Sequence, residues 1–166
     1  RLPGMLNATI KECPVFGGKV ASFDASKALA MKGVKKVMKV GDTAVAVVAD
    51  TWWQAKTALD SVSITWDEGP NAKVSSASIA EALKAGLDAP QGFVGNQSGD
   101  VKAGLAGAVR KVEAVYAYPF QNHAPMEPMN FTARWTPEKC ECWGPTQNGE
   151  AAFAVAVDAS GLPANR

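Results

Sequence analysis

The pattern of apolar and polar residues predicts a strand-rich first part of the chain, over residues 1–70. Apolar residues that alternate with polar ones, or that run on between turn residues, are typical of strands. On this basis we expect strands at 5–13, 19–23, 34–40, 45–49 and 63–66. Helices are expected at 25–31, with Asp24 as N-cap, and at 52–62. Strands and helices that alternate so closely indicate one small α/β unit.

The residues of two of these strands predict different degrees of burial, and the helix that follows them has a predicted apolar stripe. Residues 34–40 hold three lysines, which is typical of a strand at the edge of a sheet. Residues 45–49 are apolar throughout, which predicts a strand buried on both faces. Asp50 or Thr51 is expected to cap the next helix. The apolar stripe of that helix is expected to consist of Trp52, Ala55, Leu59 and Val62.

Residues 71–108 are expected to form a linker that carries short helices. Ser78 and Glu81 have the spacing of a capping box, at the start of the first of these helices. Its narrow apolar stripe would be formed by Ile79, Ala82, Leu83 and Leu87. Residues 88–100 contain the glycines and proline of a surface loop. Asp100 is then expected to cap a second helix, which ends near Ala108.

The second strand-rich part covers residues 109–166. Alternating apolar residues predict strands at 109–118, at 129–135 and around Cys140 and Cys142, which would share one face. The last two strands would form a hairpin. A helix is expected at 149–159, with Gly161 as C-cap. The fold class predicted for the whole chain is α+β.

The composition restricts the classes of partner. The net charge is +1, which gives no reason to expect nucleic acid or an anionic membrane as partner. No apolar run has the length of a transmembrane segment. One histidine and three cysteines are too few soft ligands for a structural zinc site, so no metal ligand is predicted. The odd number of cysteines argues against a disulfide framework, and we expect buried free thiols.

The stretch 119–130 contains three of the prolines and the single histidine, His123. Each proline lacks a backbone donor, which excludes a helix interior or a central strand. An extended, stiff connection would therefore display Gln121, Asn122 and His123. The same composition also fits a crossover between strands in which these side chains only satisfy buried backbone groups.

Several kinds of catalytic site are excluded by the sequence. No serine, cysteine or threonine lies in a nucleophile-elbow pattern, and Gly17-Gly18 lacks the further glycines of a phosphate loop. Polar residues remain in two places, the stretch 121–127 and the turn 143–148. Both offer amides, which donate and accept hydrogen bonds without a change of charge. Amides suit a polar, oxygen-rich or heteroaromatic cofactor better than acid–base chemistry.

Six stretches of the chain, in their order and spacing, resemble one enzyme family. They are PGML at 3–6, ALAMKGV at 28–34, VAVVADTWWQA at 45–55, ITWDEG at 64–69, YPFQNHAPMEP at 118–128 and WGPTQ at 143–147. The first four are similar to the α/β hammerhead domain of the molybdenum hydroxylases, the xanthine dehydrogenase and aldehyde oxidase family. The last two resemble the start of that family's molybdopterin-binding domain, which would be truncated here. The branch identified is the isoquinoline 1-oxidoreductase β subunit with related bacterial aldehyde dehydrogenases.

The resemblance implies a function and a set of cofactors. Such enzymes hydroxylate aldehydes or N-heteroaromatics with oxygen derived from water. They use molybdenum held by molybdopterin, here expected in its cytosine dinucleotide form. Electrons leave through [2Fe-2S] clusters, expected on a small partner subunit. Gln121 matches the family's glutamine that hydrogen-bonds an oxo ligand of molybdenum, and Gln147 lies in a turn near the cofactor. His123 and Glu127 match positions that support the loop of Gln121.

Two family features are missing from the sequence, the glycine-rich Gly-Gly-Gly-Phe-Gly motif and the late carboxylate that acts as base. Both are expected beyond Arg166, so no catalytic residue is assigned within residues 1–166. The chain by itself is expected to be an inactive fragment without bound cofactor. The branch indicates the bacterial periplasm, with the cytoplasm as the other possibility. The alternative interpretation is a non-enzymatic α/β module that binds a protein partner.

Overall fold

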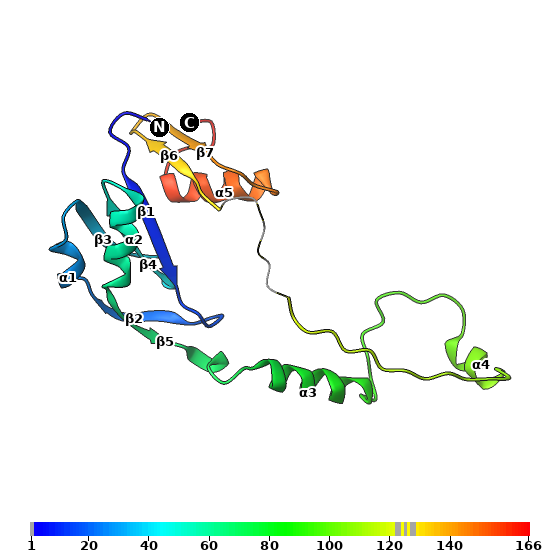
Figure 1. The fold of residues 1–166 in the computed structure, drawn as a ribbon. Coiled ribbons are helices and arrows are strands. Elements are labelled where there is room, and N and C mark those ends of the chain that lie inside the picture. Colours follow the sequence, from blue (N-terminus) through cyan, green and yellow to red (C-terminus); the bar gives the residue numbers. More distant parts are fainter. Residues whose placement is uncertain (1, 122–123, 125, 127–128) are drawn as a thin grey trace. The chain divides into compact units, whose positions relative to one another are not determined.

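The computed structural model describes residues 2–121, 124, 126 and 129–166. The chain is a mixed α/β structure that divides into two compact units, Arg1–Ala108 and Val109–Arg166. Figure 1 shows both units and the labels of their helices and strands. The hammerhead character of the first part and the three-part division at residues 70 and 108 stay predictions.

An antiparallel three-stranded sheet forms the body of the first unit. Its strands are β1 (Asn7–Glu12), β4 (Ala44–Ala49) and β3 (Val34–Val40), in the order β1-β4-β3. The lysine-rich β3 lies at the edge and the apolar β4 at the centre, which confirms both predictions. A second antiparallel pair joins β2 (Lys19–Asp24) to β5 (Ser63–Asp67).

The core of the first unit lies between these strands and two helices, α1 (Ser26–Leu29) and α2 (Trp52–Asp60). The buried side chains that cluster there are Val20, Ala28, Val45, Val47, Ala58, Leu59 and Val62. The prediction that Trp52 belongs to the apolar stripe of α2 is wrong, because 54% of this residue is exposed. It is the first residue of the helix, and its ring contacts Trp53 at a centroid distance of 6.4 Å. Burial of this cluster is the main stabilising contribution in the unit.

The two helices begin differently from each other. Thr51 caps α2 in a capping box, where its hydroxyl accepts from Gln54 N at 3.3 Å and its own N donates to Gln54 Oε1 at 3.1 Å. The N-cap of α1 is Ala25 and not Asp24 as predicted, and the helix is shorter than expected. Asp24 Oδ1 still accepts from Ser26 N at 2.9 Å, so the carboxylate closes a turn just before the helix.

The middle of the chain holds a 3₁₀ turn at Gly69–Asn71, α3 (Ser76–Leu87) and α4 (Val101–Ala106). The predicted capping box is wrong: Ser75 and Ser78 form it, since each hydroxyl pairs with the other residue's backbone N–H. Asp100 caps α4 as predicted, although the helix ends at Ala106. The residues of the apolar stripe that was expected on α3 are mostly exposed, with 65% exposure at both Leu83 and Leu87. Within the described ranges, no helix is long and apolar enough to cross a membrane.

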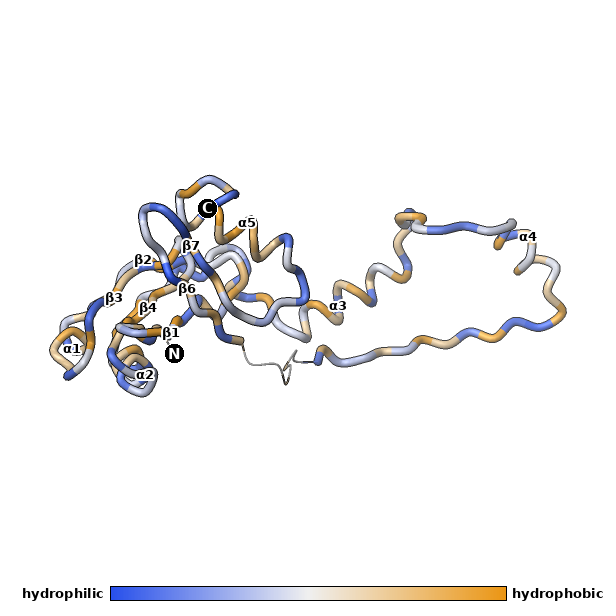
Figure 2. Tube along the Cα trace, turned by 90° about the horizontal axis from the view of Figure 1, so that it is seen from above, coloured by the Kyte–Doolittle hydropathy of each residue, from blue (hydrophilic) through white to orange (hydrophobic). Residues whose placement is uncertain are grey.

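The second unit holds the hairpin of β6 (Thr132–Trp135) and β7 (Cys140–Trp143), followed by α5 (Gly149–Ser160). The strand predicted at 109–118 is wrong. That segment is extended, and Figure 2 shows apolar and polar residues alternating along it, between α4 and the grey trace. A strand needs a neighbour for its backbone N–H and C=O groups, and the described residues offer none here.

Candidate cofactor-binding site

The turn 143–148 connects β7 to α5 and is held by its own side chains. A Cβ atom added to Gly144 would overlap the ring of Phe131, so a larger residue there would require this ring to shift. Thr146 Oγ1 accepts from Asn148 N at 3.0 Å, and Asn148 Oδ1 accepts from Ala151 N at 3.0 Å as the N-cap of α5. These bonds fix the backbone on both sides of Gln147, which is exposed.

The start of α5 adds a favourable field for negative charge next to Gln147. The first backbone N–H groups of a helix have no partner within the helix, and the helix dipole places partial positive charge there. The Asn148 side chain accepts from the N–H of Ala151. No side chain in the described part of the chain caps the N–H groups of Gly149 and Glu150. The turn and the helix start can therefore donate hydrogen bonds to an anionic or oxygen-rich group.

Gln121 is exposed at the end of the extended segment of the second unit. Its carboxamide has no hydrogen-bond partner among the described residues. No hydrogen bond within the described part of the chain joins Gln121 to Gln147, and their shared role at one site stays a prediction. His123 and Glu127 lie outside the described residues.

A hollow of about 300 Å³ lies between the hairpin and α5. The residues that line it include Phe131, Cys140, Cys142, Gly144, Thr146, Phe153, Ala156, Val157 and Ser160. Trp135 Nε1 donates to Ser160 O at 3.1 Å and so ties the end of the helix to β6. Two turn residues reach this hollow, whereas Gln147 does not line it. No sequence pattern indicates the hollow, because the helix and hairpin that form it are separate segments that meet only in the folded chain.

The cysteines are free, as predicted, but the prediction that they are buried is wrong. Cys13 and Cys140 are half-buried and Cys142 is exposed. In the second unit, α5 and the C-terminal residues lie beside the hairpin, where Cys140 N donates to Arg166 O at 2.9 Å. Cys140 and Cys142 do share one face of β7, with their sulfur atoms 3.8 Å apart. Partial burial of the sulfur and the hydrogen bond to Cys140 raise the pKa of the Cys142 thiol.

The described residues offer no group of three or more His, Cys, Asp or Glu side chains that could hold a metal ion. The donors at the two predicted places are amides and backbone N–H groups. This donor set fits a cofactor that brings its own metal ligands and is held by hydrogen bonds, as a molybdopterin is. Gln121 and Gln147 stay the side chains that the sequence predicts for those bonds.

Comparison with known proteins connects this donor set to one family. Residues 87–166 match the model of the molybdopterin cofactor-binding domain. The chain is 30% identical over 158 residues to one of the subunits of the nicotinate dehydrogenase of Pseudomonas putida. That alignment covers 89% of this chain and 13% of the relative.

Two solved structures share the fold. The copper- and molybdenum-containing CO dehydrogenase in its carbon monoxide reduced state has a TM-score of 0.69 at 20% identity, over 99% of this chain and 27% of its own. Quinoline 2-oxidoreductase from Pseudomonas putida 86 has a TM-score of 0.69 at 16% identity, over 99% of this chain and 26% of its own. The chain thus spans 13% of the curated relative's length. The domain match over residues 87–166 and the 30% identical relative support a fragment of the molybdenum hydroxylase family.

Proposed function

We propose that this chain is part of the large subunit of an oxidoreductase that hydroxylates a small N-heteroaromatic compound or an aldehyde. The observation that carries the proposal is the molybdopterin cofactor-binding match over 87–166, which contains both Gln121 and the turn of Gln147. The name of the relative, nicotinate dehydrogenase, favours an N-heteroaromatic acid over an aldehyde. When bound, the molybdenum cofactor supplies the oxidation and the oxygen transfer.

The residues of this chain would position the cofactor. The Gln121 amide would donate to an oxygen atom of the cofactor, and an amide does so without giving up its proton. The Gln147 side chain and the N–H groups at the start of α5 would bind its polar or anionic part. Because Gly144, Thr146 and Asn148 already fix the turn, little conformational entropy would be lost when the cofactor binds.

The finer features of the proposal follow the family resemblance. Residues 1–70 would be a hammerhead-type domain, and His123 and Glu127 would support the loop of Gln121. The cofactor would be the cytosine dinucleotide form, and a small [2Fe-2S] subunit would accept the electrons. The base that completes the reaction would come from protein outside residues 1–166. The periplasm stays the predicted compartment.

A substitution of Gln121 in the full-length enzyme with its partner subunit tests the proposal. We expect Gln121→Ala to lower kcat for nicotinate or a related azaheterocycle by roughly 10- to 100-fold, the usual cost of losing one hydrogen bond beside a metal centre. Gln97→Ala is the matched control, since Gln97 is an exposed glutamine in the same matched region. Its kcat should equal that of the wild type.

Molybdenum content and dye-linked oxidation are measured on the same samples. Unchanged kinetics in Gln121→Ala would remove Gln121 from the site and leave the family function standing. A full-length, matured protein that holds no molybdenum and oxidises neither azaheterocycles nor aldehydes would refute the function itself.

A further inference from the structure

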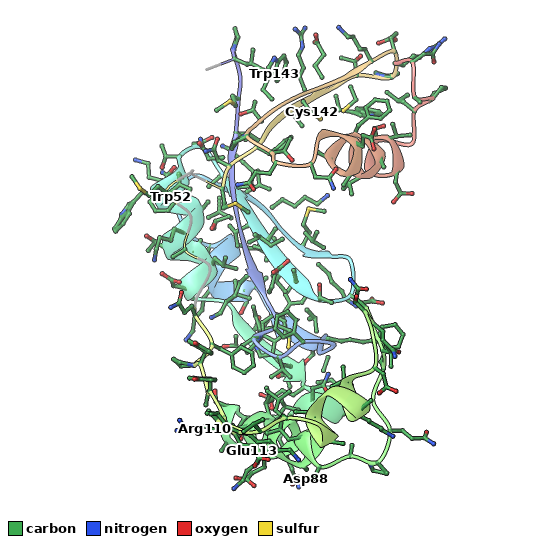
Figure 3. All side chains as sticks on the ribbon, turned by 90° about the vertical axis from the view of Figure 1, so that its right-hand side faces the viewer. Trp52, Asp88, Arg110, Glu113, Cys142 and Trp143 are labelled. Atoms are coloured by element: carbon green, nitrogen blue, oxygen red, sulfur yellow. The ribbon has the colours of Figure 1, made fainter. Side chains whose placement is uncertain are left out.

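The thiols of Cys140 and Cys142 form a pair that the proposed function does not use. They are two residues apart on β7, on the same face, with Sγ atoms 3.8 Å apart. Figure 3 labels Cys142 and Trp143 on this strand. Both cysteines line the hollow of about 300 Å³ beside α5, so they border the same space.

The spacing is unsuitable for a disulfide. Residues two apart on a strand have Cα atoms about 6.6 Å apart, and their Cβ atoms point the same way. A disulfide requires Cβ atoms about 3.8 Å apart, which a straight strand cannot bring about without moving the backbone. Under reducing conditions the two thiols therefore stay side by side and share one hydrogen bond.

The same spacing fits two ligands of a tetrahedral metal ion. Zn²⁺ binds thiolate sulfur at about 2.3 Å, so two sulfur ligands at the tetrahedral angle lie about 3.8 Å apart. The observed separation of 3.8 Å is therefore already the edge of such a tetrahedron. A two-coordinate linear ion would need the sulfur atoms further apart, at twice the metal–sulfur bond length.

We propose that Cys140 and Cys142 bind a thiophilic divalent cation of the zinc class, with both sulfur atoms as thiolates and the remaining positions open to water. Each thiol loses its proton to solvent when the ion binds, and no electron is transferred. No third His, Cys, Asp or Glu ligand accompanies the pair among the described residues, so the ion is exchangeable and not structural.

The neighbouring charges permit a cation at this place. Glu141 lies between the two cysteines in sequence, and strand alternation turns it to the other face, where Lys139 Nζ pairs with it at 2.7 Å. Arg166 also lines the hollow. Two thiolates neutralise a divalent ion, so the bound site carries no net charge for Arg166 to repel.

Zinc titration of the 166-residue chain tests the proposal. The chain is kept reduced by a phosphine, and Zn²⁺ is titrated in competition with a chromophoric chelator. We expect about one zinc per chain, and binding at least about tenfold weaker in Cys140→Ser and in Cys142→Ser. Cys13→Ser is the matched control, because it removes the third thiol from the other unit and should keep wild-type binding.

Cobalt provides a second measurement of the same site. Co²⁺ bound by two thiolates in a tetrahedral site should give a sulfur-to-metal charge-transfer band that disappears in both serine variants. Far-UV circular dichroism of every variant checks that the serine exchange leaves the fold unchanged. Zinc binding that survives in Cys140→Ser, that is lost in Cys13→Ser, or that is absent from the folded wild-type chain would overturn the proposal.

Discussion

The two units of this protein use the same kinds of element and reach different degrees of burial. In the first, Val45 and Val47 are 0% exposed on a central strand that α2 covers. In the second, Phe153 is 56% and Val155 is 67% exposed on α5, which lies against a two-stranded hairpin. No described residue of the second unit reaches full burial. An apolar pattern is enough to specify an element, whereas a sealed core requires a further layer.

This difference predicts different stabilities. A two-stranded hairpin with one helix buries little apolar surface, and that burial has to exceed the conformational entropy lost on ordering the chain. The first unit has the additional strands and helix that make such burial possible. We therefore expect one cooperative unfolding transition, from the first unit, and weak protection of the second.

The largest effect is expected from a charge placed in the sealed core. Val47→Asp would bury an unpaired carboxylate on β4, which costs several kcal/mol, about as much as a small domain's stability. The cooperative transition of the first unit should disappear. Urea unfolding followed by circular dichroism measures this directly.

The matched substitution in the second unit is Val155→Asp. Since this side chain is mostly exposed and lies outside the first unit, the change should leave the cooperative transition intact, with the urea midpoint of the wild type. Equal losses in the two variants would mean that the units do not differ in burial as described.

A smaller effect is expected from the two capping boxes. Thr51→Ala should destabilise the first unit by about 1 kcal/mol, because α2 packs on the sheet and its cap contributes to the cooperative transition. Ser75→Ala removes the same motif from α3, which contributes no side chain to the core cluster. It should reduce helix content in circular dichroism and leave the urea midpoint of the first unit unchanged.

The smallest effect is expected from acid. Hydrogen bonds from Lys39 to Asp42, and from Ser26 to Asp24, lower the pKa of both carboxyls below 3.8 in the folded protein. Groups with a lowered folded pKa stabilise the fold above their unfolded pKa and lose this as the pH falls through the folded value. The urea midpoint of the first unit should therefore decrease below about pH 3.8, and less so in Asp42→Asn.

The same chemistry in the second unit should leave no such signal. Lys139 lowers the pKa of Glu141 in the same way, but no cooperative transition reports on it there. A midpoint that is constant down to about pH 2, or that falls equally in Asp42→Asn, would contradict the assignment to Asp42.

Local patterns predict most elements correctly where the decisive forces act between near neighbours. Strand β3 and the start of α2 lie where the sequence predicts them, and the caps Thr51 and Asp100 are among the predicted residues. The Ser78–Glu81 box is wrong because Ser75, three residues before Ser78, offers the same bonds. The matched region and its turn are also recognisable from their motifs.

Features that depend on packing between distant residues are not predictable in this way. The alternation at 109–118 indicates a strand as strongly as that of β3, but only β3 has a neighbour to bond with among the described residues. Likewise, the sequence predicts that the thiols of β7 are buried. Their exposure in the structure depends on how many layers cover the hairpin.

The sequence alone determined the periodicity of each segment, the turn and cap residues, and the amides offered at positions 121 and 147. These follow from backbone geometry and side-chain chemistry within a few residues. The tertiary structure decided which apolar faces are sealed, that 109–118 lacks a strand partner among the described residues, and that two thiols lie 3.8 Å apart beside a hollow. The physical reason is that burial and strand pairing each require two surfaces in contact, whereas the sequence of one segment specifies only one of these surfaces.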